Sequence, residues 1–178
     1  MKKILLTLAA LALASSLQAQ EYESMLGFEL AQTRGYVSNT NYRWSNSFGA
    51  RVGAETGLSR VYVNYNYIDA DSSVSTGTYA IQTLELNIEA KTRPYFDRLR
   101  GFAGGHVGAV YSRIKVPIRN FDQDDFDLIY GVQGGMIVEF TDNLYLEIGY
   151  KYSWTQSKEY DVNFERLESV YGAFNFKI

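Results

Sequence analysis

Few residues in this sequence could carry out covalent chemistry. Its 178 residues include one histidine, His106, and no cysteine. A serine nucleophile needs a neighbouring base, usually histidine, so an acyl-transfer site would have to include His106. The alternation of apolar and polar residues described below places His106 on the inner face of its strand, out of reach of a lipid that contacts the outer face. We therefore predict that the protein is not an enzyme, and a lipid A-modifying enzyme is the weaker alternative.

The acidic segment NFDQDDFD could supply oxygen ligands to a calcium ion. Its candidate ligands are Asp122, Asp124, Asp125 and Asp127. The segment lacks the glycine and the terminal glutamate of an EF-hand loop, and clusters of acidic residues usually stay solvated. We therefore favour a solvated acidic loop over a metal site, and we expect no cofactor.

Residues suited to molecular recognition lie in the segment GYVSNTNYRWSN. They are Tyr36, Tyr42, Arg43 and Trp44. Tyrosine, tryptophan and arginine dominate the energetics of binding surfaces, but aromatic residues also form the girdles of membrane barrels. The two roles are about equally favoured, so these residues are candidates for extracellular contacts with a ligand that the sequence does not specify.

Apolar residues alternate with polar ones along most of the chain, which is the pattern of half-buried β-strands. In LYLEIGYKYSW, for example, Leu144, Leu146 and Ile148 share one face, whereas Glu147 and Lys151 lie on the other. The pattern predicts eight strands, at residues 24–33, 46–55, 60–68, 78–90, 99–112, 127–140, 144–154 and 167–178. No segment has a sustained helical period.

The predicted connections alternate in length. Residues 34–45, 69–77, 113–126 and 155–166 form long connections, whereas residues 56–59, 91–98 and 141–143 form shorter ones. An antiparallel meander then places every long loop at the same end, as in outer-membrane barrels. Within the fourth strand, Tyr79 and Ile81 are out of step with Leu84 and Leu86, which predicts a β-bulge near Thr83.

Alternation alone does not decide which face of the strands points outwards. A soluble periplasmic lipocalin-like barrel encloses its apolar face and could carry an apolar ligand, whereas a membrane barrel turns that face to lipid. Three features favour the membrane: glycine and sparse charges on the polar faces, aromatic residues near strand ends, and a last strand rich in aromatics. We therefore predict an all-β, eight-stranded antiparallel up-and-down transmembrane β-barrel.

The polar face of such a barrel carries many charges. Side chains nearly fill the lumen of an eight-stranded barrel, so charges there must pair. The predicted inward charges are six acids and three bases: Glu29, Glu55, Glu85, Glu89, Glu139, Glu147, Arg51, Arg100 and Lys151. The surplus of three acids predicts that some glutamates are hydrated, protonated, or hydrogen-bonded to Tyr62 or Tyr145.

Charged residues that lie on adjacent strands, or that can reach one another across the lumen, are expected to form specific ion pairs. Arg51 is expected to pair with Glu29 and to lie within reach of Glu85. The second arginine, Arg100, is expected between Glu89 and Glu139. A network of this kind could gate a narrow channel or plug the lumen, and we favour a stabilising plug because eight strands close so tightly.

The first 19 residues, MKKILLTLAALALASSLQA, have the organisation of a secretory signal peptide. Lys2 and Lys3 precede an apolar run that is too short to span a bilayer, and Ala19 is suited to cleavage. We therefore predict a signal peptide over residues 1–19 and a barrel domain over residues 20–178. The net charge of −3 and the lack of a basic block argue against a nucleic-acid partner.

The signal peptide, the alternating strands and the terminal segment YGAFNFKI resemble the small eight-stranded outer-membrane barrel superfamily, which includes the OmpA membrane domain, OmpX and the Opa adhesins. The resemblance covers residues 20–178. It implies a structural or surface-interaction role in the outer membrane of a Gram-negative bacterium, in contact with outer-membrane lipid and lipopolysaccharide. It also implies recognition of the last strand by the barrel-assembly machinery, although Ile178 stands where phenylalanine is usual.

Overall fold

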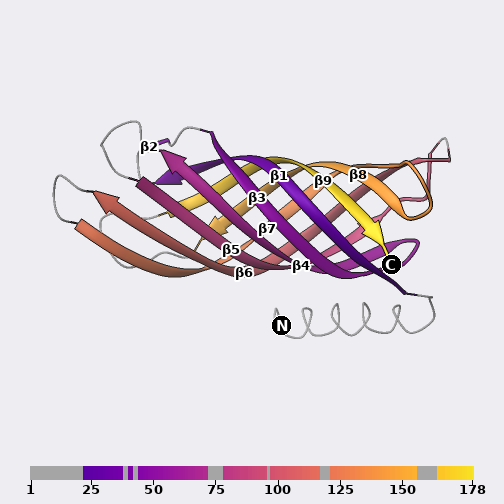
Figure 1. Cartoon of the computed structure of the whole chain (residues 1–178), viewed down its shortest axis with the longest axis horizontal. Helices are drawn as coiled ribbons and strands as arrows, with labels where there is room; N and C mark the ends of the chain where they lie inside the picture. Colours follow the sequence, from indigo (N-terminus) through magenta and orange to yellow (C-terminus); the bar gives the residue numbers. More distant parts are fainter. Residues whose placement is uncertain are drawn as a thin grey trace, which may run out of the picture.

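The chain forms a closed antiparallel barrel in the computed structural model, which describes residues 22–37, 40–41, 44–71, 78–95, 97–116, 121–155 and 164–178 (Figure 1). Its strands are β1 (Glu23–Val37), β2 (Thr40–Asn41), β3 (Ser45–Glu55), β4 (Ser59–Asp71), β5 (Thr78–Lys91), β6 (Leu99–Val116), β7 (Phe121–Glu139), β8 (Leu144–Thr155) and β9 (Phe164–Lys177). The short strand β2 pairs with the end of β1. The other eight strands pair in chain order, and β9 returns to pair with β1.

The predicted eight-stranded barrel is therefore confirmed. The strands reach further than predicted at the loop end, where β1 continues to Val37, β6 continues to Val116, and β7 begins at Phe121. The predicted signal peptide, residues 1–19, lies outside the described residues. Within the described residues, no helix is long and apolar enough to cross a membrane.

The predicted β-bulge near Thr83 is wrong. Strand β5 pairs with β4 and with β6 in continuous register through this residue. Ile81 is out of step with Leu84 because its side chain points into the barrel, where it is 4% exposed. The change of phase in the sequence thus marks a change in what fills the lumen, not an extra residue in the strand.

The strands are steeply tilted, as their register shows. Paired residues lead from Met25 of β1 around the wall and back to Gly35 of the same strand, a displacement of ten residues. An eight-stranded barrel with this displacement has strands tilted by about 40° and a lumen that side chains can fill. Side chains from opposite walls can therefore touch.

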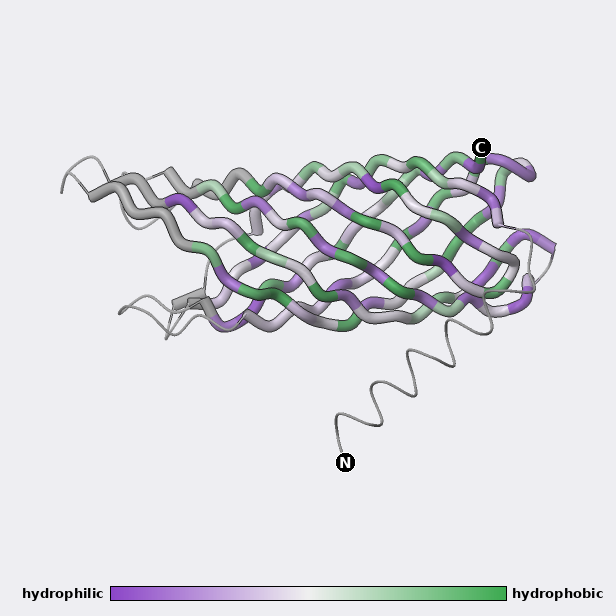
Figure 2. The backbone as a smooth tube through the Cα atoms, turned by 90° about the horizontal axis from the view of Figure 1, so that it is seen from below, coloured by the Kyte–Doolittle hydropathy of each residue, from purple (hydrophilic) through white to green (hydrophobic). Residues whose placement is uncertain are grey.

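Apolar side chains cover the outside of the barrel, and mostly polar side chains fill it. Phe28 and Val52 are 57% and 59% exposed, whereas Arg51 and Glu147 are 1% and 0% exposed. Hydrophobic and hydrophilic residues alternate along the strands (Figure 2). The soluble carrier needed an apolar interior, so that alternative is wrong. The apolar wall instead matches a lipid environment.

Three short turns join the strands at one end, where β9 also ends (Figure 1). A threonine hydroxyl accepts backbone hydrogen bonds in each turn: Thr56 from Leu58 and Ser59, Thr92 from Gly101, and Thr141 from Asn143 and Leu144. Such side-chain to backbone bonds satisfy donors that the strand ladder leaves open. In membrane barrels the end with short turns faces the periplasm.

Glycines on the inner wall make room for aromatic rings. Gly149 pairs with Tyr171, and a Cβ added to Gly149 would lie 2.6 Å from the Tyr171 hydroxyl oxygen. The ring of His106 covers Gly131 in the same way. A lumen this narrow accepts large side chains only where the neighbouring residue has none.

Candidate functional site

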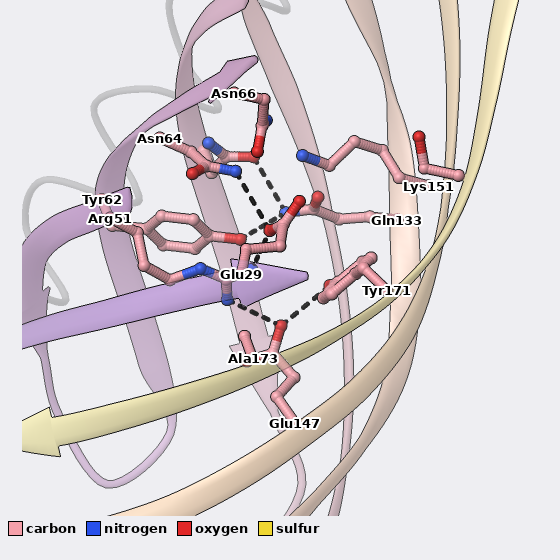
Figure 3. Close-up of polar contacts among 12 residues, drawn as sticks. Glu29, Arg51, Tyr62, Asn64, Asn66, Gln133, Glu147, Lys151, Tyr171 and Ala173 are labelled. Carbon is pink, nitrogen blue, oxygen red and sulfur yellow. Dashed lines mark hydrogen bonds and ion pairs between the residues drawn. The ribbon is translucent and has the colours of Figure 1, made fainter. Parts of the chain in front are cut away.

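Glu147 lies deep in the lumen and binds two arginines from other strands. Its Oε1 accepts a hydrogen bond from Arg51 Nη1 at 2.9 Å, and its Oε2 accepts one from Arg60 Nη2 at 2.5 Å. Arg51 also donates to Glu29, and Arg60 Nε donates to Glu89 at 2.8 Å. Figure 3 shows Glu29, Arg51 and Glu147 converging in the lumen. The five side chains form one row of alternating charges, which we call the charge network.

Tyrosine hydroxyls satisfy further carboxylate oxygens. Tyr171 donates to Glu147 at 2.8 Å, Tyr62 to Glu89 at 2.7 Å, and Tyr145 to Glu55 at 2.6 Å. The Arg51 guanidinium also lies 4.9 Å from the ring centroid of Tyr62 and 5.3 Å from that of Tyr171. Buried ion pairs are stable only with such additional hydrogen bonds. The tyrosines and the charge network therefore depend on one another.

Further ion pairs lie on either side of the charge network. Towards the loops, Lys151 Nζ lies 2.8 Å from Glu85 Oε2. Towards the short turns, Lys91, Lys177 and Arg100 bind carboxylates: Lys91 Nζ to Glu55 Oε1 at 3.2 Å, Lys177 Nζ to Glu55 Oε1 at 3.4 Å, and Arg100 Nε to Glu139 Oε1 at 2.8 Å. Ion pairs therefore continue from the short turns to beyond mid-barrel.

The inner wall carries every predicted lumen residue: Glu29, Arg51, Glu55, Glu85, Glu89, Arg100, Glu139, Glu147 and Lys151. The expected pairs of Arg51 with Glu29 and of Arg100 with Glu139 are present. The other two expectations are wrong, because Glu85 binds Lys151 instead of Arg51, and Glu89 binds Arg60 instead of Arg100.

The predicted surplus of three acids left out three bases, although the hydrogen bonds that it led us to expect, from Tyr62 to Glu89 and from Tyr145 to Glu55, are present. Arg60, Lys91 and Lys177 supply three bases that the sequence prediction omits. Arg60 and Lys91 lie at strand ends, where boundaries are least certain. The alternation with Tyr62 would have placed Arg60 inside, and the alternation with Glu89 would have done the same for Lys91.

Aliphatic side chains close the lumen at the loop end. The cluster, which we call the aliphatic cap, consists of Ile68, Ile81, Val110, Ile129 and Leu167, all at most 7% exposed. A small cavity with room for about one water molecule separates the cap from the charge network. Its lining includes Thr33, Ser47, Glu85, Lys151 and Ser169. The sequence prediction omits the cap. The one indication of it in the sequence is that Ile81 is out of step with the outward-facing Leu84 and Leu86.

His106 points into the lumen, as expected, and is 6% exposed. Its Nε2 lies 2.9 Å from the Oγ of Ser153. Its Nδ1 has no hydrogen-bond partner among the described residues, so no carboxylate orients the ring as in a catalytic triad. The pair lies behind the barrel wall, out of reach of lipid acyl chains.

The recognition candidates are only partly described. Tyr36 belongs to β1 instead of a loop, and Trp44 immediately precedes β3. Their ring centroids lie 4.7 Å and 5.0 Å from the guanidinium carbon of Arg34. Tyr42 and Arg43 lie outside the described residues.

The acidic segment is part of a strand, so the expected loop is wrong here. Asp122, Asp124, Asp125 and Asp127 fall within β7, paired with β6. The side chains of Asp122, Asp124 and Asp125 lie outside the described part of the structure. In the part that is described, no group of three or more histidine, cysteine, aspartate or glutamate side chains could hold a metal ion.

The sequence of residues 5–171 matches the family of outer membrane protein beta-barrel domains. The chain belongs to this family. No curated protein matches the sequence. Among solved structures, Neisserial surface protein A is similar, with a TM-score of 0.77 and 14% identity over 89% of this chain and 100% of that chain.

Two other solved barrels share the fold with this outer-membrane barrel. Ail, the attachment invasion locus protein of Yersinia pestis, has a TM-score of 0.63 and 14% identity over 89% of this chain and 99% of that chain. Outer membrane protein H of P. aeruginosa has a TM-score of 0.60 and 19% identity over 88% of this chain and 99% of that chain. The low identities mean that these likenesses concern the fold alone.

Family membership places this outer-membrane barrel in the outer membrane of a Gram-negative bacterium. The apolar outer wall then contacts lipid.

Proposed function

We propose that this outer-membrane barrel is a structural and surface-interaction protein with a sealed lumen, oriented with its short turns in the periplasm and its aliphatic cap towards the cell exterior. The observation that carries the proposal is the succession of two barriers, the charge network and the aliphatic cap. An ion would have to break paired charges and then cross a constriction of aliphatic groups, which resists wetting. A plug that also stabilises the wall accounts for both barriers, whereas a narrow channel accounts for neither.

Recording from planar lipid bilayers tests the seal. We expect no steady conductance from purified protein, whereas an open porin reconstituted in the same way conducts. Heat-modifiable gel mobility of the same preparation shows that the barrel is folded, so a missing current cannot reflect missing protein structure. Steady ohmic conductance from the folded barrel would overturn the proposal.

The proposed surface contacts involve the segment that contains Tyr36, Tyr42, Arg43 and Trp44. Two of its aromatic rings lie at the loop end of the outer wall. Ail, which shares the fold, has been solved in complex with the heparin analogue sucrose octasulfate. If this segment contacts similar polyanions, Arg43→Ala weakens retention on a sulfated polysaccharide resin, and Arg93→Ala at the opposite end does not. Equal retention of both variants would contradict this role.

Export and assembly complete the proposal. Residues 1–19 would be removed as a signal peptide, so the amino-terminal sequence of the purified protein should begin at Gln20. The barrel-assembly machinery would recognise β9, whose Phe174 and Phe176 point outwards at 49% and 43% exposure. Phe176→Ser should then reduce the fraction of heat-modifiable barrel in the outer membrane without reducing synthesis. Unchanged assembly would contradict this recognition.

The proposed role is not enzymatic, because His106 and Ser153 lie inside a sealed lumen. Purified barrel incubated with lipid A micelles should release no fatty acid. Release that disappears in His106→Ala would instead establish a lipid-modifying enzyme.

A further inference from the structure

Two strands of the outer wall change from apolar to charged at the loop end. The outward residues of β1 are first Leu26, Phe28 and Leu30, then Gln32, Arg34 and Tyr36. On the neighbouring strand β9 they are Phe176, Phe174 and Val170, then Glu168 and Arg166. Arg34 pairs with Glu168 in the sheet, and Tyr36 pairs with Arg166. These four residues, the seam cluster, lie directly above the apolar band.

The four side chains hold one another in place. Arg34 Nη2 donates to Glu168 Oε2 at 2.7 Å, and Arg166 Nε lies 3.6 Å from Glu168 Oε1. The Tyr36 ring contacts both arginines, with its centroid 4.7 Å from Arg34 and 3.8 Å from Arg166. Two guanidinium groups are thus fixed near each other by one carboxylate and one aromatic ring.

The cluster is positively charged and has unused donors. Two arginines face one glutamate, and the Arg34 and Arg166 side chains are 31% and 38% exposed, against 10% for Glu168. Each guanidinium has five N–H donors, so both retain donors that an incoming anion could use.

The level of the seam cluster along the barrel indicates which kind of anion it binds. It follows the apolar residues of the same strands, and Tyr152 and Trp154 of β8 pair with Glu168 and Arg166 in the sheet, so two aromatic residues of the kind found in membrane girdles lie at the same level. Lipid headgroups occupy this level at the outer leaflet. Arginine binds phosphate through paired, charge-assisted hydrogen bonds, so a headgroup phosphate fits both the donors and the depth.

We propose that Arg34 and Arg166 bind the phosphate of an outer-leaflet lipid on the outer wall, with Glu168 and Tyr36 as positioning residues. This inference rests on the proposed orientation of the barrel in the outer membrane. It adds a specific lipid site to a protein whose general lipid contact follows from its apolar wall.

Intrinsic fluorescence can report the binding, because the two tryptophans of the chain lie close to the cluster. Trp44 lies 5.0 Å from Arg34, and Trp154 packs on Tyr152, which accepts a hydrogen bond from Arg166. The purified barrel in zwitterionic detergent is titrated with bisphosphorylated lipid A, with lipid A lacking both phosphates, and with inorganic phosphate. We expect a saturable change with bisphosphorylated lipid A alone.

Arg34→Gln and Arg166→Gln should each weaken that binding about tenfold, as expected for the loss of one charge-assisted contact. Arg93→Gln, an exposed arginine at the opposite end, should leave it unchanged. Equal binding of lipid A without phosphate would overturn the phosphate assignment. An equal response to inorganic phosphate would overturn the lipid assignment.

Heat-modifiable mobility and the absence of conductance are measured on the same variants. A folded, sealed wild-type barrel that does not respond to lipid A would overturn the seam-cluster site and leave the proposed function intact. A barrel that conducts, yet binds lipid A through these arginines, would overturn the proposed sealed lumen and leave the seam-cluster site intact.

Discussion

The side chain of Glu147 accepts hydrogen bonds from Arg51, Arg60 and Tyr171 and is completely buried. Its removal leaves two guanidinium groups close together without their shared counter-charge. Breaking one partner of a buried ion pair usually costs about 3–5 kcal/mol. Glu147→Ala should therefore lower the free energy of unfolding by about this amount, as measured by urea unfolding in lipid vesicles.

Glu139→Ala provides the matched control for that measurement. Glu139 also pairs with an arginine, Arg100, but its side chain is 21% exposed at the end of the barrel. A solvated ion pair contributes about 1 kcal/mol or less. Equal destabilisation by the two variants would show that the depth of Glu147 in the lumen has no special importance.

Individual ion pairs could be predicted only where the partners lie on adjacent strands. Arg51 lies two residues from Gly49, the partner of Glu29 in the sheet, and Glu139 lies two residues from Ile137, the partner of Arg100, so a register set by the short turns brings each pair together. The contact of Glu147 with Arg60 crosses the lumen and depends on the ten-residue displacement of the whole sheet. No local pattern in the sequence encodes that displacement, so this contact could not be derived from it.

At the scale of the strands, the close approach of β8 and β9 depends on Gly149. A Cβ at this position would meet the Tyr171 ring and hydroxyl at 2.6–2.8 Å, and this side chain is buried and hydrogen-bonded to Glu147. Gly149→Ala should destabilise the barrel by about 1–3 kcal/mol and weaken the bond between Tyr171 and Glu147. Gly57→Ala, where nothing lies within 4 Å of the added atom, should have little effect on the urea midpoint. Similar midpoints for the two variants would refute the steric argument.

The periplasmic turns share one device, a threonine hydroxyl that binds backbone N–H groups. We expect Thr56→Ala, Thr92→Ala and Thr141→Ala each to reduce stability by about 1 kcal/mol, because one net hydrogen bond is lost. Asp142→Ala, in the same turn as Thr141, is the control and should unfold like the wild type. Wild-type urea midpoints for all three threonine variants would show that water replaces these bonds without cost.

The strands themselves were largely predictable, since each has an apolar and a polar face with a period of two. The prediction fails at the loop end, where the aliphatic cap places Ile68, Ile81 and Ile129 inside a barrel whose interior is mostly polar. Hydrophobic patterning cannot distinguish an aliphatic side chain in lipid from one in a dry plug. Strands β6 and β7 are longer than predicted for a different reason, because the added paired segments contain charged residues such as Arg113, Asp122 and Asp124 and so have no apolar alternation.

At the scale of the whole molecule, the orientation of the wall is testable because the chain has no cysteine. A fluorophore on Ile148→Cys, at a position 52% exposed on the outer wall, should be quenched by lipids with brominated acyl chains. The same fluorophore on Asp142→Cys, in a short turn, should be quenched by aqueous iodide instead. The opposite result would mean that the apolar face is not in contact with lipid.

Closure of the wall joins two strands that are far apart in the chain. β1 and β9 form thirteen residue pairs, yet all other wall strands are synthesised between them. Until β9 arrives, every incomplete sheet has two open edges and an apolar surface, both of which favour aggregation. Ring closure is consequently an all-or-none event of high contact order, and a nascent chain in the periplasm is safe only while other proteins shield those edges.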